Sequence, residues 1–300
     1  MSDFDPTQHR MVPAQRWFED FVLGERFVIP SRTQTSAVFA AFQTASGDTH
    51  PIHYDVEYCR SRGMPDLLAH GFQTLVHTAP GAGLFPYVVE ESLIGFLEQS
   101  SKFLKPVYAG DTLRAESEVI GLRPNSNGTS GVVWVRTTGY DQTDQPVLSY
   151  VRWVMVRKRD SAAPAGETVV PDLAAVVDPG ALVIPEGLSF EGYDFTLAGE
   201  PHRWGDYAVG EVIDHVDAVT VEEAEHMLAT RLWQNTAKVH FDATFRDDGR
   251  RLIYGGHVIS MARALSFNGL ANAQMIVALN GGAHANPCFA GDTIRAWSEV

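Results

Sequence analysis

The stretch PVYAGDTLRAESEV, residues 106–119, occurs a second time as PCFAGDTIRAWSEV at residues 287–300, and ten of the fourteen positions are identical. Three shorter pairs recur in the same order, at offsets of 181 to 187 residues. They are FEDFVLGER (18–26) with GDYAVGEV (205–212), GDTHPIHYD (47–55) with QNTAKVHFD (234–242), and LLAHG (67–71) with LIYGG (252–256). So long a period predicts two copies of one domain, because solenoid repeats span only about 20–50 residues.

The composition agrees with two globular domains. The 300 residues are 45% hydrophobic, and about 150 residues form a typical domain. No apolar run approaches the roughly 18 residues of a membrane helix, and the polar N-terminus has no signal-peptide core. Cys59 and Cys288 cannot build a disulfide framework, so we expect a reduced, cytoplasmic protein. The net charge of −14 argues against nucleic-acid or anionic-membrane partners.

The order of the predicted elements indicates the fold class. Residues 35–45 predict a short helix capped by Thr35, and residues 71–79 predict a more buried helix. Four strand patterns follow, at residues 93–104, 111–121, 131–139 and 147–157. A helix followed by a meander of strands predicts an α+β fold, with an antiparallel sheet packed against a helix.

The second copy has its own helix signals. A capping box at Thr220–Glu223 predicts a helix over 221–232, and residues 256–272 predict the second central helix. We therefore expect an N-terminal domain over 1–160, a linker rich in Ala, Pro and Gly over 161–202, and a C-terminal domain over 203–300. Val300 aligns with Val119, so the last two strands of the repeat have no counterpart. Because native sheets avoid uncovered edges, we expect the chain to be a piece of a longer protein.

The loop SGDTHPIHYD, residues 46–55, is the strongest candidate for chemistry. Asp48 and His53 are five residues apart on a segment broken by glycine and proline, so a carboxylate and an imidazole can converge on one water. An ordinary turn is the alternative, because Gly, Asp, Thr and Pro are turn formers. His50 and His53 also have the spacing of a metal pair, but Pro51 disfavours a helix and no further ligand is evident nearby. We predict no metal site.

The segment Ala69-His70-Gly71 begins the buried helix. Free N–H groups at a helix N-terminus can donate to a developing oxyanion, and glycine permits close approach to the backbone. A glycine selected only for steric reasons is the alternative. His70 is interpreted as a satisfied structural histidine rather than a catalyst.

With these motifs in place, the pattern FQTASGDTHPIHYD, LLAHGF and FLKPVYAGDTL resembles the MaoC-like (R)-specific enoyl-CoA hydratases of the hotdog superfamily. The resemblance implies a double hotdog, in which an antiparallel sheet wraps around a central helix in each of two repeats. It implies that Asp48 and His53 are catalytic and that the Gly71 N–H is the oxyanion donor. His50 departs from the family, which usually has asparagine there. The second half, with LWQNTAKVHFD and LIYGGHVISMARALSFNGLANA, more narrowly resembles mesaconyl-CoA (2-methylfumaryl-CoA) hydratases.

The second copy differs from the first at its chemical positions. His240 is retained, but Asn235 replaces Asp48, and an amide cannot serve as a base at neutral pH. We expect this copy to have lost chemistry and kept a shaping role, although Asn235 and His240 could simply hydrogen-bond their loop.

Three cations are candidates for substrate binding. Arg263 lies within an apolar helix pattern and needs an anion, either a structural carboxylate or one on the substrate. Lys238 stands where the first copy has proline. Lys105 could meet a CoA phosphate, with simple solvation as the alternative.

The resemblance thus implies a hydro-lyase acting on a short, branched enoyl-CoA, in particular reversible hydration of mesaconyl-CoA to a methylmalyl-CoA. Neither a metal nor a redox cofactor is expected, and the acyl-CoA is the expected partner, with a possible homo-oligomer. A hotdog thioesterase is one alternative, because one fold hosts several activities. A non-catalytic acyl-CoA binding protein is the other. The intact loop favours hydration over the first, and the presence of Asp48 disfavours the second.

Overall fold

The protein is described by a computed structural model that covers residues 5, 8, 13–164, 166–195 and 199–300. The strands are β1 Arg26–Thr33, β2 Leu93–Phe103, β3 Thr112–Pro124, β4 Ser130–Tyr140, β5 Pro146–Arg157, β6 Val212–Thr220, β7 Ala278–Leu279 and β8 Thr293–Glu299. The helices are α1 Ser36–Ser46, α2 Val56–Ser61, α3 Gly71–His77, α4 Phe85–Val88, α5 Glu223–Leu232, α6 Gly255–Leu265 and α7 Phe267–Leu270. Within the described residues, every helix is too short or too polar to cross a bilayer.

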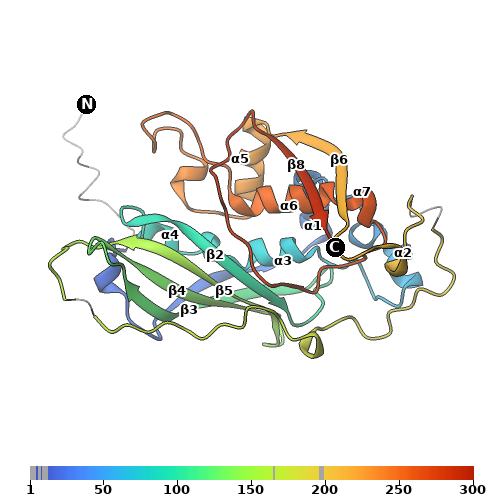
Figure 1. The fold of residues 1–300 in the computed structure, drawn as a ribbon, viewed down its shortest axis with the longest axis horizontal. Helices are drawn as coiled ribbons and strands as arrows, with labels where there is room; N and C mark the ends of the chain where they lie inside the picture. The colour runs from blue at the N-terminus through green and yellow to red at the C-terminus, as the bar shows by residue number, and fades with distance from the viewer. Residues whose placement is uncertain (1–4, 6–7, 9–12, 165, 196–198) are drawn as a thin grey trace.

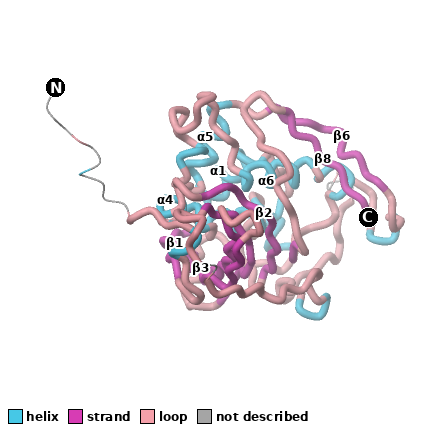
Figure 2. Tube along the Cα trace, turned by 60° about the vertical axis from the view of Figure 1, so that its left-hand side comes forward, coloured by secondary structure: helices cyan, strands magenta, loops and turns pink. Residues whose placement is uncertain are grey.

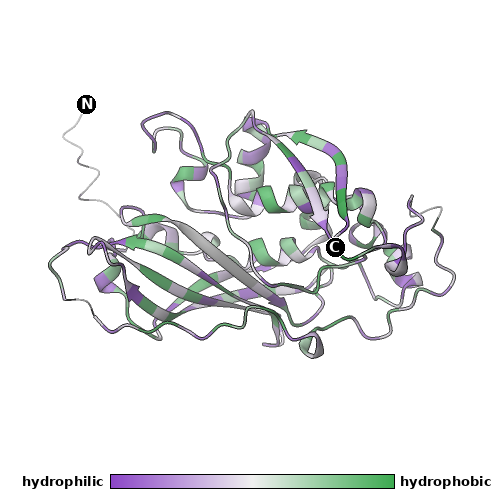
Figure 3. Ribbon diagram, viewed as in Figure 1, coloured by the Kyte–Doolittle hydropathy of each residue, from purple (hydrophilic) through white to green (hydrophobic). Residues whose placement is uncertain are grey.

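A six-stranded antiparallel sheet dominates the molecule, in the order β1-β3-β4-β5-β2-β7 (Figure 1). All four predicted strands of the first copy are present, which confirms the α+β class. Hydrophobic and hydrophilic bands alternate along these strands (Figure 3), as expected for a sheet with two different faces. The face away from the helices is covered by the linker, because Leu173 packs against Trp134 and Val151.

The central helices α3 and α6 lie between this sheet and a separate two-stranded sheet of β6 and β8 (Figures 1 and 2). The central helix α3 is buried over Phe72–His77. Its Phe72 and Val76 belong to the same core cluster as Phe42 of α1 and Trp233, which follows α5. The two halves of the chain therefore share one hydrophobic core.

The helix α1 matches its prediction closely. It begins after Thr35, whose hydroxyl accepts a hydrogen bond from the Val38 N–H at 3.3 Å. It ends at Gly47, which adopts a φ of 78°, a left-handed conformation that favours glycine. This end of α1 sets the starting point of the loop that carries Asp48.

The predicted boundaries of two helices in the second copy are wrong. Thr220 does not cap a helix: it ends β6, where its hydroxyl pairs with that of Thr293 at 2.8 Å, and α5 begins at Glu223. The second central helix is shorter than predicted, because Gly269 has a φ of 90°. The carboxylate of Glu200 also accepts the Gly269 and Ala271 N–H groups, at 3.0 and 3.1 Å.

Sequence patterns did not predict β1, β6 or β7. The strand β7 has only two residues, and it joins the second half of the chain to the edge of β2 through the pairs Ser101–Leu279 and Lys102–Ala278. This pairing brings the segment before β7 to the end of β2. The domain boundaries at 160 and 202 stay a prediction.

Candidate active site

The Asp48 carboxylate is held by its own loop. Its Oδ1 accepts the His50 N–H at 2.9 Å, and its backbone N–H donates to the Ser46 hydroxyl at 3.2 Å. The residue is buried, with 3% of its surface exposed. A carboxylate hydrogen-bonding back to the backbone two residues on is a common way to order a turn, so the turn interpretation and the chemical one apply to the same loop.

His53 presents one ring nitrogen for chemistry. Its Nδ1 lies 2.7 Å from the carbonyl oxygen of Leu68, which can only accept, so Nδ1 carries the proton and Nε2 keeps its lone pair. Burial lowers the pKa of this imidazole to about 3, so the ring is neutral at neutral pH. Nε2 is therefore free to accept a hydrogen bond.

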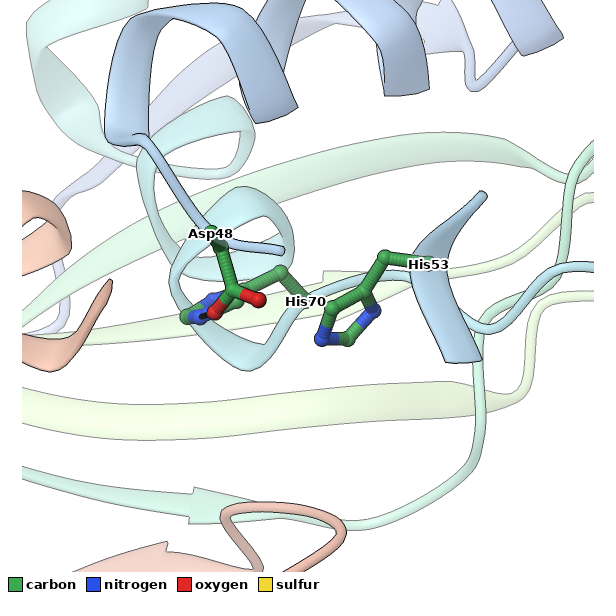
Figure 4. A group of neighbouring side chains, drawn as sticks. All are labelled: Asp48, His53 and His70. Atoms are coloured by element: carbon green, nitrogen blue, oxygen red, sulfur yellow. Dashed lines mark ion pairs between the residues drawn. The ribbon is translucent and has the colours of Figure 1, made fainter. Parts of the chain in front are cut away.

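His70 completes a cluster with Asp48 and His53 (Figure 4). Its Nε2 lies 2.9 Å from Asp48 Oδ2, and its Nδ1 accepts the Phe72 N–H at 3.0 Å. Each of the three side chains offers a polar atom within 4.8 Å of the others. Burial acts to raise the pKa of Asp48, but the hydrogen bond from His70 and the neighbouring polar groups outweigh it and lower that pKa. The interpretation of His70 as merely structural was incomplete, because the ring contacts the candidate base.

The three side chains are close enough to share a metal ion, although no metal site was predicted from the sequence. However, both nitrogens of His70 and the Nδ1 of His53 already make hydrogen bonds. Binding an ion through His70 would break its bond to Asp48 or its cap on α3. The free acceptor atoms suit a water molecule better than a metal ion.

Gly71 is the first residue of α3 and lines the cavity beside His53. Its N–H has no hydrogen-bond partner among the described residues. A Cβ at this position would lie 2.9 Å from the Phe103 ring, so only glycine leaves the helix start open. Gly71 and His53 thus line the same cavity.

The cavity has a volume of about 60 Å³ and is lined by three parts of the chain. The first copy contributes His53, Leu68, Ala69, His70, Gly71, Thr74, Phe103, Lys105, Pro106 and Val107; the linker contributes Val183 and Pro185; the second copy contributes Arg263, Gln274, Met275, Ile276 and Val277. One water molecule occupies roughly 10–15 Å³ of such a cavity, so the cavity has room for a short chemical group.

Arg263 reaches this cavity from α6. Its guanidinium donates to the Ser266 hydroxyl at 2.9 Å and to the Ala273 carbonyl at 3.3 Å. It makes no ion pair among the described residues, although Asp48 is near enough to influence it electrostatically. Burial lowers the pKa of Arg263, as expected for a cation without a close anion. The predicted structural carboxylate is thus absent from the described part of the chain.

The two candidate lysines differ in their surroundings. Lys105 lines the cavity, and its ammonium group pairs with Asp141. Lys238 pairs with Glu90 at 2.7 Å and does not line the cavity. The structure therefore brings Lys105, but not Lys238, to the candidate site.

The corresponding loop of the second copy keeps the hydrogen bonds of the first, although asparagine replaces the aspartate. Asn235 Oδ1 accepts the Ala237 N–H at 2.9 Å, and His240 Nδ1 lies 2.9 Å from the Leu252 carbonyl oxygen, as in the first copy. Neither side chain lines the cavity. At the start of α6, a Cβ on Gly255 would lie 2.4 Å from the His284 ring. These contacts agree with a shaping role.

His50, the departure from the family motif, also acts within its loop. Its Nδ1 accepts the Ile52 N–H at 3.2 Å, and its ring hydrogen-bonds the backbone of Ala271 in the second half. The loop is therefore tied both to itself and to the segment that follows α7.

Sequence reasoning missed the contribution of residues 183–185 and 274–277 to the cavity. The linker is poor in periodic pattern, and residues 274–277 carry no motif. The AHG segment does contain a hint of the role of His70. His70 directly precedes a helix, and a side-chain acceptor is favoured at that position.

Known proteins share this sequence and architecture. The family of the MaoC like domain matches residues 21–140. The chain is 63% identical to a mesaconyl-CoA hydratase of Cereibacter sphaeroides, over 96% of this chain and 83% of that protein. It is 47% identical to a β-methylmalyl-CoA dehydratase of Chloroflexus aurantiacus, over 95% of this chain and 81% of that protein.

Two solved structures support the same assignment. A MaoC-domain dehydratase from Chloroflexus aurantiacus superposes with a TM-score of 0.90 at 46% identity, over 97% of this chain and 84% of that one. A Mycobacterium tuberculosis protein described as a double hotdog superposes with a TM-score of 0.73 at 28% identity, over 93% and 84%. The predicted fold and resemblance are confirmed: the chain belongs to the MaoC-like family of dehydratases and has a double hotdog fold.

Proposed function

We propose that this protein is a hydro-lyase that reversibly hydrates mesaconyl-CoA to a methylmalyl-CoA. The observation that carries the proposal is the cluster of Asp48, His53 and His70, because His53 and His70 line the same small cavity as Gly71. The similarity to a mesaconyl-CoA hydratase over nearly the whole chain supports the choice of substrate.

Asp48 and His53 together hold the water. A carboxylate oxygen and a ring nitrogen less than 4.8 Å apart can both accept hydrogen bonds from one water placed between them. The water oxygen attacks the β-carbon of the enoyl thioester, and its proton passes to the Asp48–His53 pair. The same pair then returns a proton to the α-carbon, so that the net reaction adds one water across the double bond.

Gly71 stabilises the charge that develops during the attack. As the carbon–oxygen bond forms, the electrons of the double bond move onto the thioester oxygen and produce an enolate. The unpartnered Gly71 N–H at the start of α3 is the donor for this oxygen. The Phe103 ring packs beside Gly71 and lines the same cavity.

Arg263 binds the free carboxylate of the substrate. It is a partly buried cation in the same cavity, without an ion pair among the described residues. A desolvated carboxylate would be costly without such a partner, so the two groups compensate each other. In this proposal the second copy contributes a specificity residue rather than a base. Asn235 and His240 shape their own loop, and Lys238 plays no part at the site.

The proposal is tested by mixing the purified protein with mesaconyl-CoA and following the loss of enoyl-thioester absorbance. A parallel assay for free thiol separates hydration from thioester hydrolysis. Loss of absorbance without thiol release supports a hydratase, whereas stoichiometric thiol release would replace it with a thioesterase.

The remaining partners are part of the same proposal. Acyl-CoA is the small-molecule partner, and Lys105 at the cavity wall is suited to a CoA phosphate. A cytoplasmic location is favoured by two free cysteines, one of them buried. Assembly into a homo-oligomer would be read from the mass of the protein in solution.

A further inference from the structure

His70 is fixed on every side. Its Nδ1 accepts the Phe72 N–H at 3.0 Å, and its Nε2 lies 2.9 Å from Asp48 Oδ2. Its ring stacks on Phe72 with a centroid distance of 5.6 Å and packs beside Phe42 at 5.4 Å. Only 3% of the residue is exposed, so the ring has no room to change its orientation.

These contacts determine the protonation of the ring. A backbone N–H can only donate, so the Nδ1 facing Phe72 must keep its lone pair. The proton of the neutral imidazole is therefore on Nε2, where it is donated to Asp48. A proton on Nδ1 would place two donors face to face at Phe72, so the start of α3 favours the tautomer with its proton on Nε2.

The consequence for Asp48 is a fixed carboxylate. The His50 N–H holds Oδ1 and the His70 Nε2–H holds Oδ2, so rotation about the last side-chain bond would break both hydrogen bonds. The other polar groups that face this carboxylate are His53 and Arg263. His53 offers no competing donor, because its only proton is used by Leu68.

We propose that His70 is a positioning residue: locked as its Nε2–H tautomer by the first turn of α3, it orients Asp48 toward the water held with His53. The inference rests on the proposed function, because it assigns a role within the same reaction. It links the helix that supplies the Gly71 donor to the orientation of the base.

Two substitutions of His70 remove its two hydrogen bonds one at a time. Asparagine keeps an acceptor for the Phe72 N–H and is a favoured cap, but its side chain is too short to reach Asp48. Glutamine can place a donor where Nε2 stands, but it gives up the cap. We expect His70→Asn to lower kcat about 10²-fold with KM changed less than about threefold, whereas His70→Gln stays within about tenfold of the wild-type kcat. In His70→Asn the acid limb of kcat/KM should also move to higher pH, because Asp48 loses a hydrogen bond to its charged form.

Two kinetic results would overturn the proposal: wild-type kcat with an unshifted acid limb in His70→Asn, or equal losses in both variants. If the protein hydrates no enoyl-CoA, the role of His70 can still be tested by NMR, which needs no turnover. Nitrogen-15 NMR of the histidines should show His70 protonated on Nε2 and His53 on Nδ1. The carbon-13 signal of the Asp48 carboxyl should titrate at higher pH in His70→Asn than in wild type. An Nδ1-protonated His70, or an unchanged titration of Asp48, would refute the role even if hydration is observed.

Discussion

Replacing Asp48 by asparagine removes the base and leaves almost the same shape. The amide oxygen can still accept the His50 N–H, but its NH₂ group then faces the Nε2–H of His70, which the start of α3 prevents from becoming an acceptor. Turning the amide around only moves the conflict to the His50 N–H. One buried hydrogen bond is therefore lost in either orientation, which costs about 1–3 kcal/mol of the free energy of unfolding.

The expected loss of hydration rate in Asp48→Asn is about 10²–10⁴-fold, the usual contribution of a general base. The rate would be measured from the enoyl absorbance of mesaconyl-CoA, and the stability from urea unfolding of the same preparation. The two measurements together separate lost chemistry from lost structure. Near-normal turnover by a folded Asp48→Asn protein would refute the assignment of the base, and an unchanged stability would refute the assigned proton of His70.

Three further predictions concern the second copy, the substrate and pH. Asn235→Ala should cost far less activity than Asp48→Ala, because Asn235 only holds the Ala237 N–H of its own loop; equal losses would mean that both copies contribute directly to catalysis. The wild-type protein should turn over mesaconyl-CoA much faster than crotonyl-CoA, which lacks the carboxylate. Arg263→Met should reduce that preference by about 10²–10³-fold, because a buried charge that loses its partner costs about 3–5 kcal/mol. A better rate with crotonyl-CoA would contradict the carboxylate role. Burial lowers the pKa values of His50 and His240 to about 4 and that of His77 to about 3, whereas the unfolded value is near 6.5. Below pH 6.5 the unfolded chain therefore binds protons that the folded protein does not. The stability contributed by these residues is complete above pH 6.5 and is lost as the pH falls toward 4. Urea unfolding should therefore give a free energy lower by about 2 kcal/mol or more at pH 5 than at pH 7.5, and equal values would show that these rings are not buried as neutral groups.

The sequence by itself determined the features that depend on local pattern. The duplicated segment, the four long strands and the cap of α1 at Thr35 were all predicted within a few residues. The three candidate groups Asp48, His53 and Gly71 were also predicted. Alternating hydrophobicity, capping residues and turn formers act over a few residues, so their effects can be read along the chain.

Tertiary structure alone decided which distant groups meet. The pairing of β7 with β2 brings residues 274–277 to the cavity, and α6 places Arg263 there. Lys238 was also predicted to bind substrate, but in the structure it forms an ion pair with Glu90 outside the cavity. The contact between the His70 ring and Asp48 likewise comes from the tertiary structure, because no local pattern indicates it. Such contacts join segments from separate parts of the chain, and no local pattern encodes them. They form because the two copies bury their apolar faces in one shared core, and the packing of that core sets which polar groups meet at its edge.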